Sequence, residues 1–116
     1  MTSGSLFAQN VPVVFEVNMS YQIEQGQFDP DTEFVDLAGT FNEWGADLTP
    51  LSDEDGDSTY SVTIDGFSAG ETIEFKFRIN GQWNGREEFP GAANNRSYTV
   101  KAIDNIVSVW YNDEAD

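Results

Sequence analysis

The sequence predicts an all-β domain, and within that class an immunoglobulin-like antiparallel β-sandwich of about seven strands. Three observations predict this fold. Short segments of alternating apolar and polar residues recur along the chain, clusters of glycine, asparagine and aspartate separate them, and no segment has a convincing helical period. With 116 residues, the chain is long enough for one hydrophobic core and too short for two. We therefore expect a single domain.

The clearest predicted strand is Ile73–Ile79, in which apolar and polar side chains alternate without a break. The alternation places its apolar residues on the core face, and it places Lys76 and Arg78 on the opposite, outward face. Asn80-Gly81 follows directly and is the pair most typical of a two-residue type I′ hairpin turn. This turn delivers Trp83 immediately after the strand.

Further strands are predicted where alternation or β-rich composition recurs, at Val11–Met19, Phe34–Phe41, Thr59–Asp65, Ser97–Lys101 and Ile106–Tyr111. Polar stretches rich in turn-forming residues are predicted as loops, at Gln22–Thr32, Gly45–Asp57 and Arg86–Asn95. In Gly39–Trp44 the end of a strand runs into a turn of small and polar residues. We expect the large ring of Trp44 to be left partly in water there.

The predicted domain spans residues 11–112, and residues 113–116 form an acidic tail. Met1–Ser5 looks like the scar of an expression vector, and Leu6–Gln9 looks like the end of a removed secretory signal, so residues 1–10 are expected to lie outside the domain. A run of about eighteen apolar residues is absent, so we expect no membrane insertion. These features predict a secreted or cell-surface protein, which we expect to be a monomer.

The composition excludes several classes of function. The sequence has 0 His and 0 Cys, which excludes disulfides, serine-triad and cysteine-protease chemistry and His-ligated zinc. A net charge of −16 argues against nucleic acid and anionic membranes as partners. Every Lys and Arg lies between residues 76 and 101. The acidic surface therefore has one locally neutralised region, and that part of the chain includes Trp83.

Two tryptophans are the main candidates for a binding site. Exposed indole rings stack on the apolar faces of sugars, while amides and charged groups bond the sugar hydroxyls. Trp44 and Trp83 each follow a turn, but they are 39 residues apart in the sequence, so the fold must bring them together. The alternative interpretation is that both pack in the core or in a hairpin.

Polar candidates accompany the tryptophans. Lys76 lies on the outward face of the clearest strand, and its alternative interpretation is an ordinary exposed lysine paired across the sheet. Short amides in loops near Trp83 are the other candidates, and turn formation is their alternative role: Asn84, Asn94 and Asn95.

The acidic run Asp53–Asp57 invites interpretation as a calcium site. The EF-hand pattern needs Glu at its twelfth position, which here is Ile64, so that pattern fails, and an acidic hairpin turn is the better interpretation. Carboxylate pairs for glycoside hydrolysis are uninformative among 21 acidic residues, and a small sandwich has little room for a deep cleft. We therefore expect no metal, no cofactor, no catalytic residue and no enzyme activity.

Four blocks of the sequence resemble one kind of protein. Phe34–Trp44, Ala69–Ile79, Asn80–Trp83 and Asn95–Val100 are similar, in this order, to segments of the starch-binding and glycogen-binding modules of carbohydrate-binding families 20 and 48. The third block resembles the glycogen-binding domain of the AMP-activated kinase β subunit. The resemblance covers roughly residues 34–111.

The resemblance implies a sandwich of the E-set, starch-binding type, with a shallow surface groove for α-1,4-glucan. It implies that Trp44 and Trp83 stack glucose rings, and that Lys76 and an asparagine bond hydroxyls. The asparagine is Asn95 if the family 20 pattern holds and Asn105 if the family 48 spacing holds. In a parent protein, such a module would be covalently linked to an enzyme domain.

The sequence also departs from the family pattern. Family 20 often has Glu directly after the second tryptophan, where Asn84 stands here, and Glu87 and Glu88 are alternatives for that role. The 86–93 loop matches neither family. Two other functions therefore stay open. One is a structural or protein-interaction sandwich without sugar binding, and the other is a module for another polysaccharide, including an anionic one bound by arginines at positions 78, 86 and 96.

Overall fold

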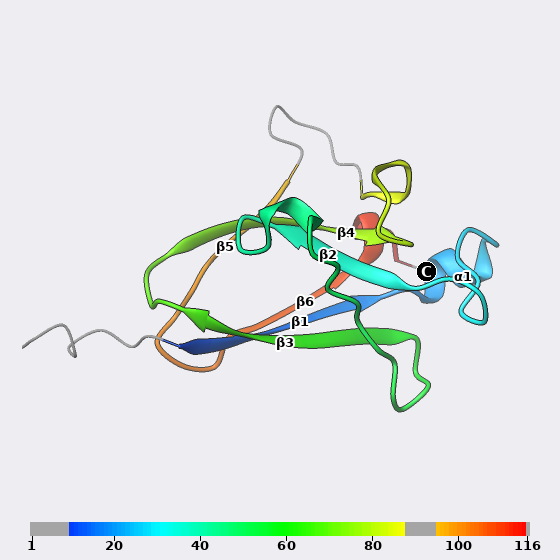
Figure 1. Cartoon of the computed structure of the whole chain (residues 1–116). Helices are drawn as coiled ribbons and strands as arrows, with labels where there is room; N and C mark the ends of the chain where they lie inside the picture. Colours follow the sequence, from blue (N-terminus) through cyan, green and yellow to red (C-terminus); the bar gives the residue numbers. More distant parts are fainter. Residues whose placement is uncertain (1–9, 88–94, 116) are drawn as a thin grey trace, which may run out of the picture.

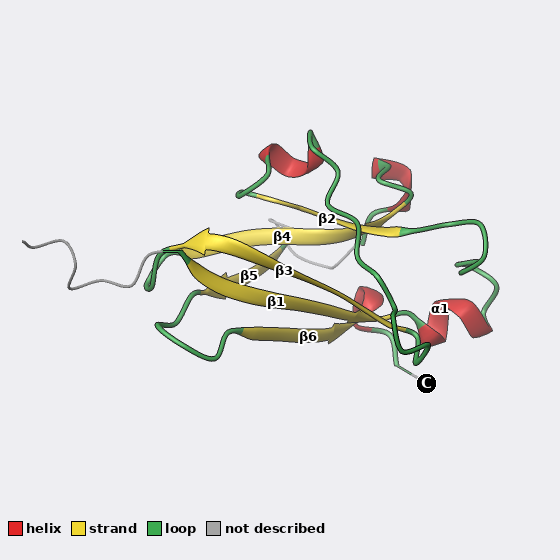
Figure 2. Cartoon of the chain, turned by 60° about the horizontal axis from the view of Figure 1, so that its bottom comes forward, coloured by secondary structure: helices red, strands yellow, loops and turns green. Residues whose placement is uncertain are grey.

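The computed structural model describes residues 10–87 and 95–115. Two three-stranded β-sheets pack face to face in it (Figures 1 and 2). The first sheet has the order β3-β1-β6, from Thr59–Phe67, Val11–Asn18 and Ile106–Trp110. The second has the order β2-β4-β5, from Val35–Gly39, Thr72–Ile79 and Arg96–Thr99. The predicted all-β class is confirmed.

The core lies between the central strands β1 and β4, because both alternate apolar and polar residues. Val13, Phe15 and Val17 of β1 are fully buried, as is Phe77 of β4. The ring of Phe15 meets that of Phe75 edge on, with centroids 5.2 Å apart. Burying each such side chain contributes about 1.5–3 kcal/mol, so this aromatic contact holds the two sheets together.

Two details differ from the predicted sandwich. The described residues form six strands rather than about seven. Arg86, which follows the turn that carries Trp83, is joined to Arg78 of β4 by an isolated bridge and not by a further strand. In addition, β1 and β6 pair in parallel, whereas an antiparallel sandwich was predicted. The chain crosses from β5 in one sheet to β6 in the other, and such a crossover permits a parallel neighbour.

A short helix is a third difference from the prediction. The predicted Gln22–Thr32 loop begins inside α1, which spans Ser20–Glu24, and its five residues are too few to show a helical period. The remaining helical segments are single 3-10 turns: η2 (Glu43–Gly45), η3 (Trp83–Gly85) and η4 (Tyr111–Asp113). Within the part of the chain that the structure describes, no helix has the length and apolar character needed to cross a membrane.

Candidate functional site

Trp44 and Trp83 meet on the outer face of the β2-β4-β5 sheet. The centroids of the two indole rings are 6.5 Å apart, and the ring planes are inclined by 43°. Trp83 is 44% exposed, and Trp44 is half-buried. Neither ring is sealed in the core. Together they form an aromatic surface that two turns, distant in the sequence, build jointly.

The side chain of Asn42 organises the turn that carries Trp44. Its carbonyl oxygen accepts hydrogen bonds from the backbone N–H groups of Gly39, at 2.9 Å, and Gly45, at 3.0 Å. Its amide nitrogen donates to the carbonyl of Leu37, at 2.7 Å, and to Thr49 Oγ1, at 3.1 Å. One asparagine therefore ties the end of β2 to both sides of the turn.

The backbone of this turn has an unusual conformation. Glu43 and Trp44 have φ values of 53° and 56°, and Gly45 has a φ of 84°. A left-handed conformation is rare for a bulky side chain and costs about 1–3 kcal/mol. Residues in such conformations cluster at ligand clamps and switch regions. The bonds of Asn42 hold Trp44 in this position.

A buried arginine lies under the ring of Trp83. Arg78 is 2% exposed, and its guanidinium carbon lies 4.8 Å from the Trp83 ring centroid. Its Nε and one terminal nitrogen bond the two carboxylate oxygens of Asp36, at 2.9 and 2.7 Å. The same terminal nitrogen donates to the carbonyl of Gly45, at 3.4 Å. The guanidinium is therefore an internal support that contacts both tryptophan-bearing turns.

The predicted hairpin turn before Trp83 is confirmed. Asn80 and Gly81 have φ values of 59° and 62°, which is the left-handed pair that a type I′ turn requires. Asn80 is fixed from outside the turn, because its side-chain carbonyl accepts from Phe34 N–H, at 3.2 Å. Gly85, at the end of η3, is as close to β4 as a glycine permits, since a Cβ there would lie 2.7 Å from the Ile79 carbonyl oxygen.

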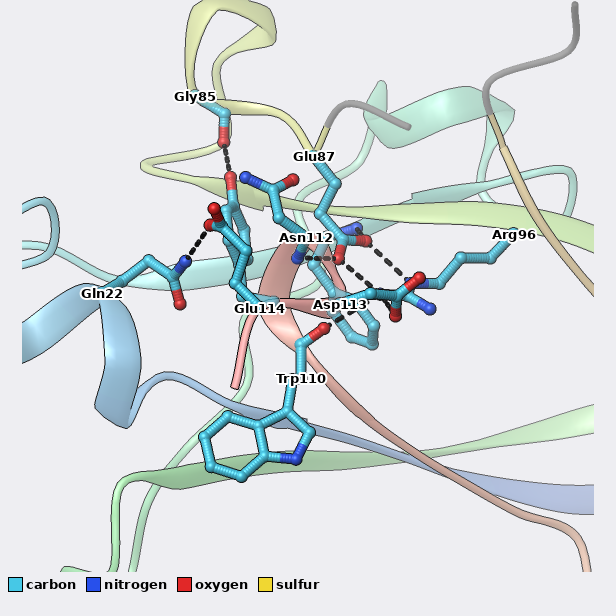
Figure 3. Close-up of polar contacts among 10 residues, drawn as sticks. Gln22, Gly85, Glu87, Arg96, Trp110, Asn112, Asp113 and Glu114 are labelled. Carbon is cyan, nitrogen blue, oxygen red and sulfur yellow. Dashed lines mark hydrogen bonds and ion pairs between the residues drawn. The ribbon is translucent and has the colours of Figure 1, made fainter. Parts of the chain in front are cut away.

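An ion-pair network built on the buried Glu87 holds the end of this hairpin (Figure 3). Glu87 is fully buried, and its two carboxylate oxygens accept from Phe77 N–H, at 3.1 Å, and from Asn112 N–H, at 2.7 Å. Both oxygens also accept from the Arg96 guanidinium, at 3.0 and 2.8 Å. Arg96 bonds Asp113 at 2.8 Å as well. The first residue of the predicted acidic tail thus takes part in the network.

The carboxylates of Glu87 and Asp113 stabilise the charged form of Arg96. Burial lowers the pKa of Arg96, but the hydrogen bonds and negative charges of Glu87 and then of Asp113 outweigh burial and raise the pKa overall. Tyr111 extends the network toward η3, because its hydroxyl donates to the carbonyl of Gly85. The C-terminal turn therefore holds the segment that presents Trp83.

Lys76 is buried, so its alternative interpretation as an ordinary exposed lysine is wrong. It lies on the outward side of β4, opposite Ala38 of β2, but it is only 4% exposed. Alternation predicts the face of a sheet on which a side chain lies, but it does not show whether other segments cover that face. Two residues further along the strand, Arg78 places its guanidinium against the ring of Trp83.

The two candidate asparagines have different surroundings. Asn95 is half-buried beside the β2-β4-β5 sheet, and its side-chain amide donates to Glu74 Oε1, at 3.1 Å. Continuing the β4–β5 register by one residue places Asn95 opposite Lys76. Asn105 precedes β6 in the other sheet and is 5% exposed. Its oxygen accepts from the Tyr98 hydroxyl, at 2.6 Å. Asn95 is therefore bonded to β4 of the sheet that carries the indoles, whereas Asn105 contacts that sheet through Tyr98 of β5.

Asn84 and Asn94 are the other two amides that were predicted to lie at the site. Asn84 is exposed in η3, next to Trp83. Asn94 lies outside the described residues.

The comparisons with known proteins concern the fold. The sequence matches no family model and no curated protein. Among solved structures, the chain is similar to a glycoside hydrolase family 15 glucoamylase from Hypocrea jecorina, with a TM-score of 0.58 and 22% sequence identity. This chain and the matched part of the glucoamylase share a fold. The match covers 86% of this chain and 16% of the glucoamylase chain, so this chain spans about a sixth of that protein's length.

The acidic loop before β3 forms the turn that was predicted there. Carboxylate oxygens of Asp53, Asp55 and Asp57 lie within 4.8 Å of one another, and such oxygens suit calcium. The two oxygens of Asp53 are already bonded to the loop's own N–H groups, those of Asp57, at 3.1 Å, and Ser58, at 2.8 Å. Its carboxylate therefore serves the turn itself.

Hydrogen bonding within this loop shifts the pKa values of Asp55 and Asp57 in opposite directions. The hydrogen bond to Asp57 raises the pKa of Asp55, with burial and the charge of Asp57 adding to the effect. The backbone N–H of Thr59 lowers the pKa of Asp57, and the hydrogen bond from Asp55 lowers it further. Asp55 is therefore the member of the pair that binds a proton first as the pH falls.

Proposed function

We propose that this domain is a non-catalytic carbohydrate-binding module that binds α-1,4-glucan by stacking glucose rings on Trp44 and Trp83. The observation that carries the proposal is the indole pair itself, with ring centroids 6.5 Å apart and Trp83 44% exposed. Aromatic rings with one face in water and a firm backing suit the apolar faces of sugars.

The support beneath the rings favours a binding role over simple packing. Trp44 has a strained left-handed backbone, with φ of 56°, and Trp83 rests on an arginine that Asp36 holds by two hydrogen bonds. Such preorganisation reduces the entropy lost when a ligand binds. A pair of tryptophans that served only to bury apolar surface would gain more in the core, where Phe15 and Phe75 lie.

Two likenesses support carbohydrate as the ligand class. The motif resemblance to families 20 and 48 includes both tryptophans, and a solved structure that shares the fold over part of its length is a glycoside hydrolase by its title. The module would act as the part of a larger secreted or cell-surface protein that holds an enzyme domain against its polysaccharide. The protein would bind sugar as a monomer and without metal.

The binding of an anionic polysaccharide is less well supported. It would need cations available to a ligand, but Arg78 is paired with Asp36 and is 2% exposed. Arg96 is paired with Glu87 and Asp113 and is 12% exposed. Two of the three arginines on which this alternative depends are thus already engaged with carboxylates.

Isothermal titration calorimetry with β-cyclodextrin tests the proposal. We expect micromolar to millimolar affinity, as for other small contact areas. Trp44→Ala and Trp83→Ala should each weaken binding by about fivefold or more, the effect of losing a residue that dominates an interface. Trp110→Phe, in the other sheet, is the control and should leave the affinity unchanged.

The same titration separates the competing functions. A wild-type domain that binds no glucan, or tryptophan variants that bind as well as the wild type while remaining folded by circular dichroism, would point to a sandwich without sugar binding. Affinity that falls steeply with salt would point to an anionic ligand, since screening weakens charge–charge attraction.

A further inference from the structure

A polar groove of about 370 Å³ lies beside the turn that carries Trp83. Three segments form it: α1 with the chain that follows it, the hairpin from Asn80 to Arg86, and the C-terminal turn η4. More than half of its lining side chains are carboxamides: Gln22, Gln27, Asn80, Gln82, Asn84 and Asn112. Trp83 itself contacts Trp44 and Arg78 instead. The hairpin thus contributes to two neighbouring surfaces.

The chemistry of the groove suits a neutral ligand with many hydroxyl groups. A carboxamide offers both donors and an acceptor, and a hydroxyl group can pair with either. The protein has a net charge of −16, yet the groove is lined by one carboxylate, Glu33, and one cation, Arg86. Glu33 already accepts from Asn80 Nδ2, at 3.2 Å. The groove is therefore nearly neutral within a strongly acidic surface.

One amide of the groove has a buried acceptor that no described group satisfies. Gln22 is 1% exposed, and its nitrogen donates to Glu114 Oε1, at 2.8 Å (Figure 3). Its oxygen is the buried side-chain polar atom that has no hydrogen-bond partner within the described structure. An unsatisfied buried acceptor costs about 1–3 kcal/mol and calls for an explanation. A ligand hydroxyl in the groove that donates to the Gln22 oxygen would be such an explanation.

We propose that a glucan chain stacked on Trp44 and Trp83 continues across the hairpin into this groove, where the carboxamides bind its hydroxyl groups. Gln82 is exposed and lines the groove. It directly precedes Trp83 in the sequence, so a glucan that leaves the Trp83 ring reaches the groove at the neighbouring residue. The inference rests on the proposed function and extends it. It predicts that the domain prefers long glucans, because only these reach both surfaces.

The test compares the affinities of maltotriose and maltoheptaose by calorimetry. Gln27 and Gln82 are exposed, and no side-chain hydrogen bond holds them in the described structure, so a Gln27→Ala/Gln82→Ala variant should fold normally. We expect wild-type protein to bind maltoheptaose more tightly than maltotriose. The variant should reduce the ratio of these affinities by about three- to tenfold, through the loss of neutral hydrogen bonds. Gln25→Ala, an exposed amide outside the groove, should leave the ratio unchanged.

A second variant tests the buried acceptor. Gln22→Leu removes the unsatisfied oxygen and should also reduce the ratio, while melting followed by circular dichroism shows whether the fold survives. Equal ratios for the wild type and both groove variants would overturn the inference and leave the proposed function standing, with water alone filling the groove. Absence of binding to either sugar by the wild type would instead overturn the proposed function, and the inference with it.

Discussion

Arg78 links the two tryptophans at the scale of single residues. Its guanidinium contacts the Trp83 ring and the carbonyl of Gly45, and Asp36 holds it from below. The sequence contained a signal for this pairing that the site prediction did not use. Asp36 and Arg78 are opposite charges on the outward faces of two predicted strands, and the register does place them opposite each other. The covering of both side chains follows from contacts with distant turns, which alternation does not reveal.

Replacing Arg78 alone should be strongly destabilising. Arg78→Leu leaves the carboxylate of Asp36 fully buried without its partner, and breaking a buried pair in this way costs about 3–5 kcal/mol. The free energy of unfolding, measured in guanidinium chloride, checks this. The Asp36→Leu/Arg78→Leu double variant should recover most of the loss, because an apolar pair of similar volume needs no partner. If the free energy of unfolding of Arg78→Leu lay within about 1 kcal/mol of the wild-type value, the role given to the Arg78–Asp36 pair would be contradicted.

Gly45 offers a second test, with a matched control in the same protein. A Cβ at Gly45 would overlap the Arg78 guanidinium, whereas a Cβ at Gly56 would meet nothing within 4 Å. Both glycines have positive φ, 84° and 73°, so alanine is strained at either position. Gly56→Ala should lower the free energy of unfolding by about 1 kcal/mol. Gly45→Ala should lower it further and change tryptophan fluorescence. Equal effects of the two variants would show that the close approach to Arg78 has no consequence for stability.

At the scale of elements, strands and local turns were predictable, and longer-range arrangements were not. The alternation of β4 and the Asn80-Gly81 pair predicted a strand and a left-handed turn that the structure contains. The five residues of α1 were missed because a periodicity needs a longer segment. The parallel pairing of β1 with β6 was missed because it depends on where the chain crosses between sheets. The sequence resemblance, rather than any local pattern, predicted that Trp44 and Trp83 lie close together.

The loop before β3 should make stability depend on pH through Asp55. The pKa of Asp55 is raised above its ordinary value of 3.8, so the folded state binds this proton more tightly than the unfolded state does. The resulting stabilisation is complete below about pH 3.8 and is lost as the pH rises through the raised pKa. Asp55→Asn keeps a donor for Asp57 at every pH. It should therefore raise the melting temperature near pH 7 and have little effect at pH 3.

Calorimetric melting of wild type and Asp55→Asn between pH 3 and pH 7 measures this difference. Asp65→Asn removes one negative charge from an exposed position and controls for net charge alone. A gain that is the same at both ends of the pH range, or equal in the two variants, would show that the Asp55–Asp57 hydrogen bond does not govern the effect.

At the scale of the whole molecule, charge should matter more for folding than for ligand binding. A net charge of −16 destabilises the compact state through self-repulsion. Salt screens this repulsion, since the Debye length falls from about 10 Å at 0.1 M to about 3 Å at 1 M. The melting temperature should therefore rise with sodium chloride, while the affinity for a neutral glucan stays nearly constant. A melting temperature that falls or stays constant would contradict this account.

The central claim is that the surface formed by Trp44 and Trp83 is the glucan-binding site. The most direct test is nuclear magnetic resonance of the indole N–H groups, because the chain has 3 tryptophans and each gives one assignable signal. On titration with β-cyclodextrin, the account predicts that the signals of Trp44 and Trp83 shift together while that of Trp110 stays in place. Unchanged signals from the pair, or a shift confined to Trp110, would contradict it.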